Sequence, residues 1–259
     1  VVEAVKKYDL DGVQLDDRIV WPYVDMGYDQ YTRKIYKQET GKDVPEGAAA
    51  EAAAGEEDVP NVEELNLEAA GLSLNEKGLL PVDDHGQTAV PHIYAAGDML
   101  GRPPALASQA MEDGRRAVSQ ALGLPVGESV NQVPIGIYTI PEIASIGLDE
   151  EQAAARYRGP LVGRAPFTEI AKGQITGACE GLLKLVTDPS GERLLGVQIV
   201  GEHATELIHL GQMALQHGAT IDRFIDTIFG FPTFAEAYRV AALDILGQRR
   251  NRQENAKAA

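Results

Sequence analysis

Short apolar runs alternate with longer amphipathic ones along the second half of the chain. Three short runs rich in Leu, Val and Ile predict β-strands at about Leu161–Pro166, Gly181–Thr187 and Leu194–Val200. The turn Asp188-Pro-Ser-Gly191 joins the last two runs and is typical of a hairpin. Two longer runs predict helices at about Ala204–His217 and Thr233–Leu246. This order of elements predicts an α/β fold in which helices flank a sheet.

The segment that leads into these strands is also apolar. Residues Pro134–Gly147 are rich in Ile, which favours extended structure. Asp149-Glu-Glu-Gln then has the spacing of a capping box and predicts the start of a helix. We therefore expect the sheet to begin near Pro134.

A different pattern lies upstream, between Thr88 and Asp98. Apolar residues from Ile93 to Ala96 lead to Gly97 and Asp98, as in a buried strand that ends against a ligand. A helix is predicted from near Ala105 to Val118. Its free N–H groups and positive dipole end would face the same place as the Asp98 carboxylate.

The first part of the chain reads as a separate piece. A helix is predicted at Val1–Tyr8, a short strand at Gly12–Leu15 and a second helix at about Tyr28–Thr40. Residues 46–58 are rich in Ala, Glu and Gly without an apolar stripe, which is typical of a linker. A domain boundary is therefore expected there.

Composition narrows the classes of function. The 259 residues carry a formal net charge of −16, which argues against nucleic acid or an anionic membrane surface as a partner. No apolar run approaches the roughly 20 residues that span a bilayer, and no export signal is recognised, so a cytoplasmic protein is expected. A single cysteine, Cys179, excludes an internal disulfide and a redox dithiol.

The segment T-x-x-P-x-I-Y-A-x-G-D, ending at Asp98, and the following L-A-x-x-A-x-x-x-G-R resemble the second flavin-binding motif of the pyridine-nucleotide–disulfide oxidoreductase family. The resemblance implies that FAD is the cofactor and that Asp98, after Gly97, binds its ribityl chain. It further implies that the backbone near Leu106 and Ala107 faces the O2 edge of the isoalloxazine. Residues 59–124 would then form the C-terminal half of a Rossmann-like FAD-binding domain.

The elements over residues 125–250 are similar in order to the dimerisation domain of the same family. The resemblance implies a mainly antiparallel sheet with flanking helices and a homodimer, with 251–259 as a disordered tail. Disulfide-reducing members carry a catalytic His-Pro-Thr with a later Glu. Phe231 stands at the His position here and Glu236 at the Glu position, so dithiol exchange is not expected and no catalytic residue is assigned.

An aromatic residue before Pro-Thr resembles the soluble transhydrogenase branch of the family, which passes hydride between NADPH and NAD through FAD. No G-x-G-x-x-G follows a strand, so the NAD(P) site and the FAD pyrophosphate loop are not found, and a truncated chain that is inactive alone is expected. Two alternatives stay open. One is a non-catalytic homodimerisation module that uses the face with Tyr238 and Arg239. The other is a dihydrolipoamide dehydrogenase-like remnant that lost its His and Cys pair.

Residues 1–45 resemble one α-β-α unit of a glycoside-hydrolase-like (β/α)8 barrel family, through D-G-V-Q-L-D-D-R and the W-P that follows. The resemblance would give Asp16 or Asp17 the place of an active-site acid. One strand cannot close a barrel, and a glycosidase needs a second carboxylate from another strand, so a solvated pair of acids on a barrel fragment is favoured.

The remaining candidates are weaker. His203, Glu206 and His209 have a helical spacing that could hold a metal, but the pattern places them beside a packed surface, and no metal site is expected. Cys179 has no basic neighbour in sequence and is expected to be inert. Lys184 and Arg193 flank the hairpin and are expected on a solvated face.

Overall fold

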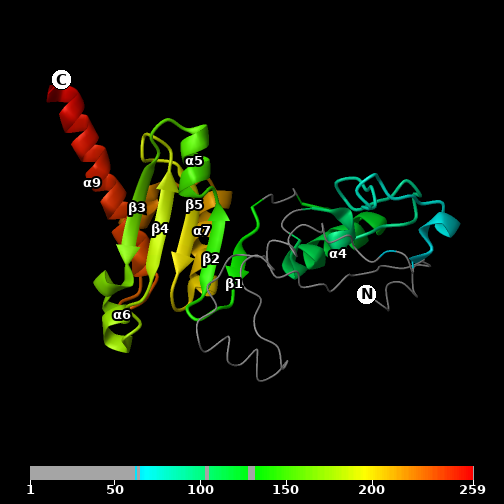
Figure 1. Ribbon diagram of the computed structural model, residues 1–259, viewed down its shortest axis with the longest axis horizontal. Helices are drawn as coiled ribbons and strands as arrows, with labels where there is room; N and C mark the ends of the chain where they lie inside the picture. The colour runs from blue at the N-terminus through cyan, green and yellow to red at the C-terminus, as the bar shows by residue number, and fades with distance from the viewer. Residues whose placement is uncertain (1–61, 63–64, 103–104, 128–131, 259) are drawn as a thin grey trace, which may run out of the picture. The chain divides into compact units, whose positions relative to one another are not determined.

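The computed structural model describes residues 62, 65–102, 105–127 and 132–258 (Figure 1). The chain divides into two compact units, Val1–Ser129 and Val130–Ala259. The expectations for the barrel-like segment 1–45, including Asp16 and Asp17, and for the linker 46–58 lie outside the described residues.

The second unit is built on a five-stranded sheet of order β1-β2-β5-β4-β3, in which every neighbouring pair is antiparallel. The strands are β1 Ile135–Ile137, β2 Ile143–Gly147, β3 Leu161–Pro166, β4 Leu182–Thr187 and β5 Leu194–Val200. The predicted strands and the α/β fold class with a mainly antiparallel sheet are confirmed. The hairpin turn closes through the Asp188 carboxylate, which accepts from the backbone N–H of Glu192 at 3.0 Å.

Helices complete this unit (Figure 1). They are α5 Glu150–Arg156, η4 Phe167–Glu169, α6 Ala171–Thr176, α7 Ala204–Gln216, α8 Ile221–Asp226 and α9 Glu236–Ala258. The short helices α6 and α8 are not predicted from the sequence. Helix α9 continues through Ala258, so residues 251–258, which were expected to belong to a disordered tail, are helical. Its last turns are held by side chains, such as Arg252, whose Nη1 donates to Gly159 O at 3.0 Å.

One face of the sheet carries the main hydrophobic core. Strand residues such as Leu183, Leu185, Val197 and Ile199 are almost fully buried beneath helices α7 and α9. At Gly163 any side chain would collide with the backbone of Ala241, so α9 approaches β3 as closely as a helix can. Burial of large aliphatic side chains at this density is the dominant stabilising term of the unit.

Tyr238 joins α9 to α7 inside this core. Its side chain is fully buried, and its hydroxyl donates to Leu207 O at 2.8 Å while it accepts from Gly211 N at 3.0 Å. In an α-helix the N–H of residue 211 pairs with the carbonyl of residue 207. The Tyr238 hydroxyl therefore contacts both the donor and the acceptor of one helical pair in α7. Burial raises the pKa of the Tyr238 phenol far above its usual value, which keeps it a donor.

Two helices of this unit are capped by acidic side chains. Asp149 and Gln152 form the expected capping box at the start of α5. At α7, Glu142 comes from a distant loop, and its Oε2 accepts from Thr205 N at 3.0 Å and Thr205 Oγ1 at 2.7 Å. These hydrogen bonds hold the pKa of the Glu142 carboxyl below its usual value. The negative charge also favours the positive end of the helix dipole.

The first unit contains less regular structure. Its described elements are η2 Leu67–Ala70, η3 Asp98–Leu100 and α4 Ala107–Ala121. The predicted buried strand before Gly97 is reduced to an isolated antiparallel bridge between Gln87 and Tyr94. The segment is extended and Ala95 and Ala96 are buried, but within the described residues no neighbouring strand continues the ladder. A small cluster that includes Leu72, Leu80 and Met99 packs beneath it.

We expect Tyr238→Phe to destabilise the second unit by about 1–2 kcal/mol, because it removes both hydrogen bonds of the buried hydroxyl. Urea unfolding followed by circular dichroism would measure the change. Tyr157→Phe, at a partly exposed position, is the control and should change the free energy of unfolding by less than about 0.5 kcal/mol. Equal stability of Tyr238→Phe and wild type would contradict this role for the hydroxyl.

Glu142→Gln should cost about 0.5–1 kcal/mol at neutral pH, allowing for solvent screening of a partly exposed group. The pKa of Glu142 is lower in the folded chain than in the unfolded chain. Its charge therefore contributes stability above the ordinary pKa of 4.5, and this contribution is lost as the pH falls through the folded value. Urea unfolding across this pH range should show the two proteins converging at acid pH. A constant difference would contradict the cap.

Candidate functional site

The backbone turns sharply at Gly97, immediately before the predicted cofactor-binding acid. Gly97 is buried and lies at φ 92° and ψ −161°, a conformation that only glycine adopts without strain. The chain then enters the short helix η3, which begins at Asp98, and leaves it at Gly101 with φ 61°. A side chain at Gly101 would collide with Leu79. Gly97, which was predicted from the sequence, and Gly101, which was not, are therefore both favoured by the local path of the backbone.

Asp98 sits on a loop that the backbone holds in place. Its side chain is half-buried, whereas Met99 and Leu100 are buried in the small core. Leu80 N donates to Met99 O at 2.9 Å, and Gly101 N donates to Asp98 O at 2.9 Å. The carboxylate is thus presented by a packed loop rather than by the end of a strand, which corrects the local structure expected from the sequence.

Helix α4 begins without a capping side chain. Its N-cap is Leu106, which offers no side-chain acceptor, and the first backbone bond of the helix runs from Ala110 N to Leu106 O at 2.9 Å. The amides of the first turn, from Ala107 to Gln109, precede that bond, and Ala107 is exposed. Within the described part of the chain, no side chain caps the positive end of this 15-residue helix, which favours a negatively polarised acceptor there.

A buried acceptor lies in the same turn. The Oε1 atom of Gln109 is buried, and it has no hydrogen-bond partner among the residues that the structure describes. Buried polar atoms are almost always paired, so an acceptor left in this position fits a bound molecule that brings a donor. The first turn of α4 can thus offer backbone N–H donors and a side-chain acceptor to one ligand. This combination suits a heterocyclic ring that has both carbonyl and N–H groups.

The segment at the family's His-Pro position is apolar and exposed. Phe231 is 75% exposed, and its peptide bond to Pro232 is cis. Glu236 has a role that the sequence analysis missed, because its Oε2 accepts from Thr233 N at 3.2 Å at the start of α9. The spacing Thr-x-x-Glu is the sequence signal for such a cap. Phe231 cannot transfer a proton, so this segment offers no acid–base pair.

Further apolar side chains are exposed near Phe231. Tyr138 and Ile140 lie between β1 and β2 with 77% and 95% exposed, and Ile228 lies between α8 and α9 with 94% exposed. Both loops flank the start of α7. Glu142, after the first loop, binds Thr205, and Phe234, after the second, lies with its ring 5.9 Å from the His203 ring. We call Tyr138, Ile140, Ile228 and Phe231 the apolar rim.

The proposed dimer face with Tyr238 and Arg239 is corrected by the structure. Tyr238 is buried within its own unit, so it cannot contact a partner, whereas Arg239 is exposed. The helical periodicity could not distinguish a buried tyrosine from one at an interface. The exposed apolar rim is the feature that the sequence analysis did not find, because its members lie in loops without periodicity.

The weaker candidates do not assemble a site. His203, Glu206 and His209 are exposed, and in the described part of the chain no group of three or more His, Cys, Asp and Glu side chains is placed to hold a metal ion. Cys179 is a half-buried free thiol. Arg193 is exposed on the hairpin, as expected, whereas Lys184 is largely buried and its Nζ lies 3.6 Å from Glu150 Oε2.

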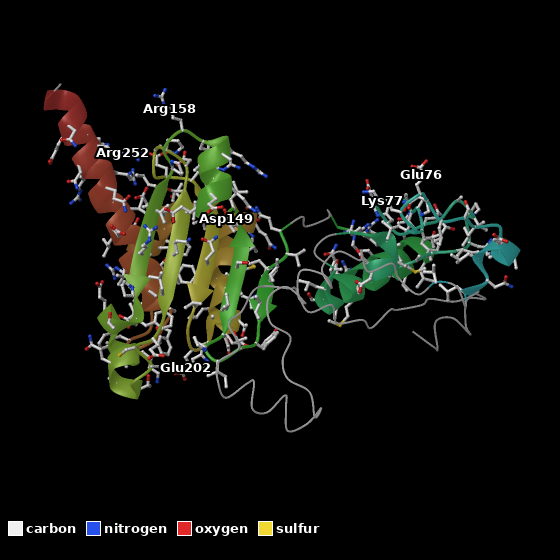
Figure 2. The ribbon with its side chains drawn as sticks, in the orientation of Figure 1. Glu76, Lys77, Asp149, Arg158, Glu202 and Arg252 are labelled. Atoms are coloured by element: carbon white, nitrogen blue, oxygen red, sulfur yellow. The ribbon has the colours of Figure 1, made fainter. Side chains whose placement is uncertain are left out.

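Within the described residues, no helix has the length and apolar character needed to cross a bilayer. Figure 2 labels charged side chains at both ends of the sheet, with Arg252 on α9 and Arg158 at one end and Glu202 at the other. The long helix α9 carries a series of basic and acidic residues in its last turns. Its length therefore does not indicate a membrane span.

Three family models match the chain. Residues 133–242 match the dimerisation domain of the pyridine nucleotide-disulphide oxidoreductases, and residues 51–114 match a second model of the pyridine nucleotide-disulphide oxidoreductases. Residues 1–54 match the family called glycosyl hydrolase-like 10. The matches agree with the resemblances drawn from the flavin motif, from the order of strands and helices, and from the first 45 residues.

Curated relatives and solved structures agree with the first two models. The chain is 44% identical over 187 residues to a soluble pyridine nucleotide transhydrogenase from Marinomonas sp. and 43% identical over 186 residues to one from Mycobacterium bovis. These alignments cover 71% and 72% of the chain but 40% of each relative. The chain therefore spans two fifths of the length of these relatives.

Among solved structures, LpdA from Mycobacterium tuberculosis has a TM-score of 0.65 at 30% identity, covering 71% of this chain and 40% of that protein. The HOCl-induced flavoprotein disulfide reductase RclA from Escherichia coli has a TM-score of 0.64 at 25% identity, covering 71% of this chain and 42% of that protein. The fold described above is thus shared with a flavoprotein of known structure.

Proposed function

The chain belongs to the pyridine nucleotide-disulphide oxidoreductase family, and we propose that it binds FAD through Asp98 and the first turn of α4 as part of a soluble transhydrogenase-type oxidoreductase. The observation that carries this proposal is the open N-terminus of α4, with its buried Gln109 acceptor, eight residues after the Asp98 loop. In the other unit, Asp149 and Glu142 accept from backbone N–H groups at the starts of α5 and α7, whereas no side chain caps the start of α4.

The residues present fit the isoalloxazine and ribityl side of FAD. The Asp98 carboxylate can accept from ribityl hydroxyls, and the first-turn amides of α4 can donate to a ring carbonyl oxygen whose charge grows when the ring is reduced. Gln109 Oε1 can accept from a ring N–H. No binding loop for the FAD pyrophosphate is recognised, because the sequence has no G-x-G-x-x-G after a strand.

When bound, FAD supplies the ring that takes and returns a hydride. The residues of this chain would orient that ring and hold its O2 edge, and they would move no proton. Phe231 at the family's His position and a single Cys179 support hydride transfer between NADPH and NAD over disulfide reduction. The same two features disfavour an active dihydrolipoamide-type enzyme. The NAD(P) site is not found in this sequence, so the complete reaction requires parts beyond those described.

A second function, homodimerisation through the C-terminal unit, is supported by the apolar rim. Four large apolar side chains, each at least 75% exposed, are costly to leave in water and are typical of an interaction surface. The matched dimerisation domain model supports a second copy of this chain as the partner.

A cytoplasmic location is part of the proposed function, because the relatives are named as soluble transhydrogenases.

Asp98→Asn should weaken FAD binding by about tenfold or more, because it exchanges charge-assisted hydrogen bonds for weaker ones at the same shape. Quenching of flavin fluorescence during titration with the full chain gives the dissociation constant. Asp84→Asn, an exposed acid in the same unit, is the control and should bind as the wild type does. Unchanged affinity in Asp98→Asn, or no binding by the wild type, would contradict the assignment.

Ile140→Glu and Phe231→Glu should each shift the chain from dimer to monomer, with a rise of at least about tenfold in the dimer dissociation constant. Sedimentation velocity over a range of concentrations would measure it. Ile175→Glu on α6 is the control, because Ile175 is 68% exposed and lies outside the apolar rim. A wild-type monomer, or equal effects of all three variants, would overturn the proposed interface.

A further inference from the structure

Arg102 lies at the point where the Asp98 loop ends. It follows Gly101, and its guanidinium reaches two acceptors on separate segments. Nη2 donates to Asp83 O at 2.6 Å, and Nη1 donates to Asp113 Oδ1 at 3.2 Å. Asp83 belongs to the tight turn before the flavin motif, and Asp113 belongs to α4. One side chain therefore connects the loop that carries Asp98 to the helix proposed to face the flavin.

The two anchor points are themselves firmly placed. Asp83 Oδ1 accepts from His85 N at 2.8 Å and from Gln87 N at 2.9 Å, which closes the turn. A side chain at Gly86 would lie 2.7 Å from Ala95 O and 3.3 Å from Ala117 Cβ, so this turn packs tightly against both the extended segment and α4. Arg102 therefore binds a backbone carbonyl within a closed turn and a carboxylate on α4.

We propose that Arg102 is a positioning residue for the flavin, whose guanidinium fixes the Asp98 loop relative to α4 by binding Asp83 O and Asp113 together. The proposal rests on the proposed function. Asp113 is six residues beyond Ala107, or about 9 Å along the helix axis, so a shift of the loop at Arg102 changes the distance from Asp98 to the open first turn. A planar guanidinium can hold two acceptors in a fixed geometry, whereas a lysine ammonium is a single point of charge.

The burial of the pair supports a positional role. The side chains of Arg102 and Asp113 are only 30% and 11% exposed. Desolvation by burial raises the pKa of the Asp113 carboxyl above its ordinary value, although Arg102 and Arg116 act in the opposite sense. A partly buried ion pair adds little net stability, so the role of this pair is argued from its geometry, in which one guanidinium joins two segments. Arg115, by contrast, pairs with Glu112 on the same helix, and both side chains are more than half exposed.

The experiment compares Arg102→Met, Arg102→Lys, Asp113→Asn and the double variant Arg102→Met/Asp113→Asn in the full chain. Arg115→Met is the matched control, because it removes an arginine pair from α4 without touching the loop. The dissociation constant for FAD is measured well below the melting temperature of each variant. We expect about tenfold weaker binding for Arg102→Met and Asp113→Asn, a smaller loss for Arg102→Lys, and no change for Arg115→Met.

Because the two side chains act together, the double variant should bind FAD no more weakly than Arg102→Met alone. Binding by Arg102→Met within about twofold of the wild type would overturn the proposal. So would an equal loss in Arg115→Met, because a general weakening of α4 would then suffice.

Amide hydrogen exchange without flavin separates this proposal from the proposed function. The amides of Leu100 and Gly101 bond within the loop, and we expect them to exchange about tenfold faster in Arg102→Met and Asp113→Asn but not in Arg115→Met. If the wild type fails to bind FAD while this pattern holds, the proposed function fails and the positioning of the loop stands. Equal exchange rates in all variants would overturn the positioning itself.

Discussion

The backbone conformation of Gly97 is the constraint on which the flavin-side unit depends. At φ 92° and ψ −161° any residue with a side chain would be strained, so the turn that directs Asp98 out of the extended segment favours glycine. The positions of the residues after the turn depend on it. Met99 and Leu100 enter the small core, Met99 O meets Leu80 N, and Arg102 reaches both Asp83 and Asp113. A packed loop thereby places one carboxylate, and the start of α4, which has no side-chain cap, follows it in the same unit.

The second unit is stabilised in a different way. A large core lies beneath α7 and α9, and the buried Tyr238 hydroxyl joins the two helices. Its apolar rim is then left exposed by a unit that is otherwise well packed. Phe231 in that rim stands at the position expected for the family's histidine, which favours the proposed hydride transfer over disulfide chemistry. A phenyl ring at the position of a proton-transferring histidine preserves apolar contact area and removes the acid–base group.

Much of the second unit could be predicted from the sequence. The strands at 161–166 and 194–200 match the structure to the residue, because apolar runs bounded by clear turns leave little freedom. The helices α6 and α8 were missed because six residues are too few to establish a helical period. The last turns of α9 lack an apolar stripe, and polar contacts such as that of Arg252 hold them instead.

The candidate site was predicted in part. Asp98 and the start of α4 at Leu106 and Ala107 follow from the flavin motif, but the strand expected before Gly97 did not form a ladder. Burial and apolar character can be read from a single segment, whereas a strand also needs a neighbour whose position the segment does not determine. Arg102 and Asp113 were missed for a related reason. They are eleven residues apart with a loop between them, so no local spacing indicates that they meet.

The proposed site would hold the isoalloxazine and ribityl side of a flavin without a pyrophosphate loop. The most direct test is the dissociation constant of the full chain for riboflavin and for FAD under the same conditions. Riboflavin contains the groups that Asp98 and α4 would bind, so we expect the two dissociation constants to lie within about threefold of each other. Binding of FAD more than about a hundredfold tighter than riboflavin, or no binding of either, would contradict it.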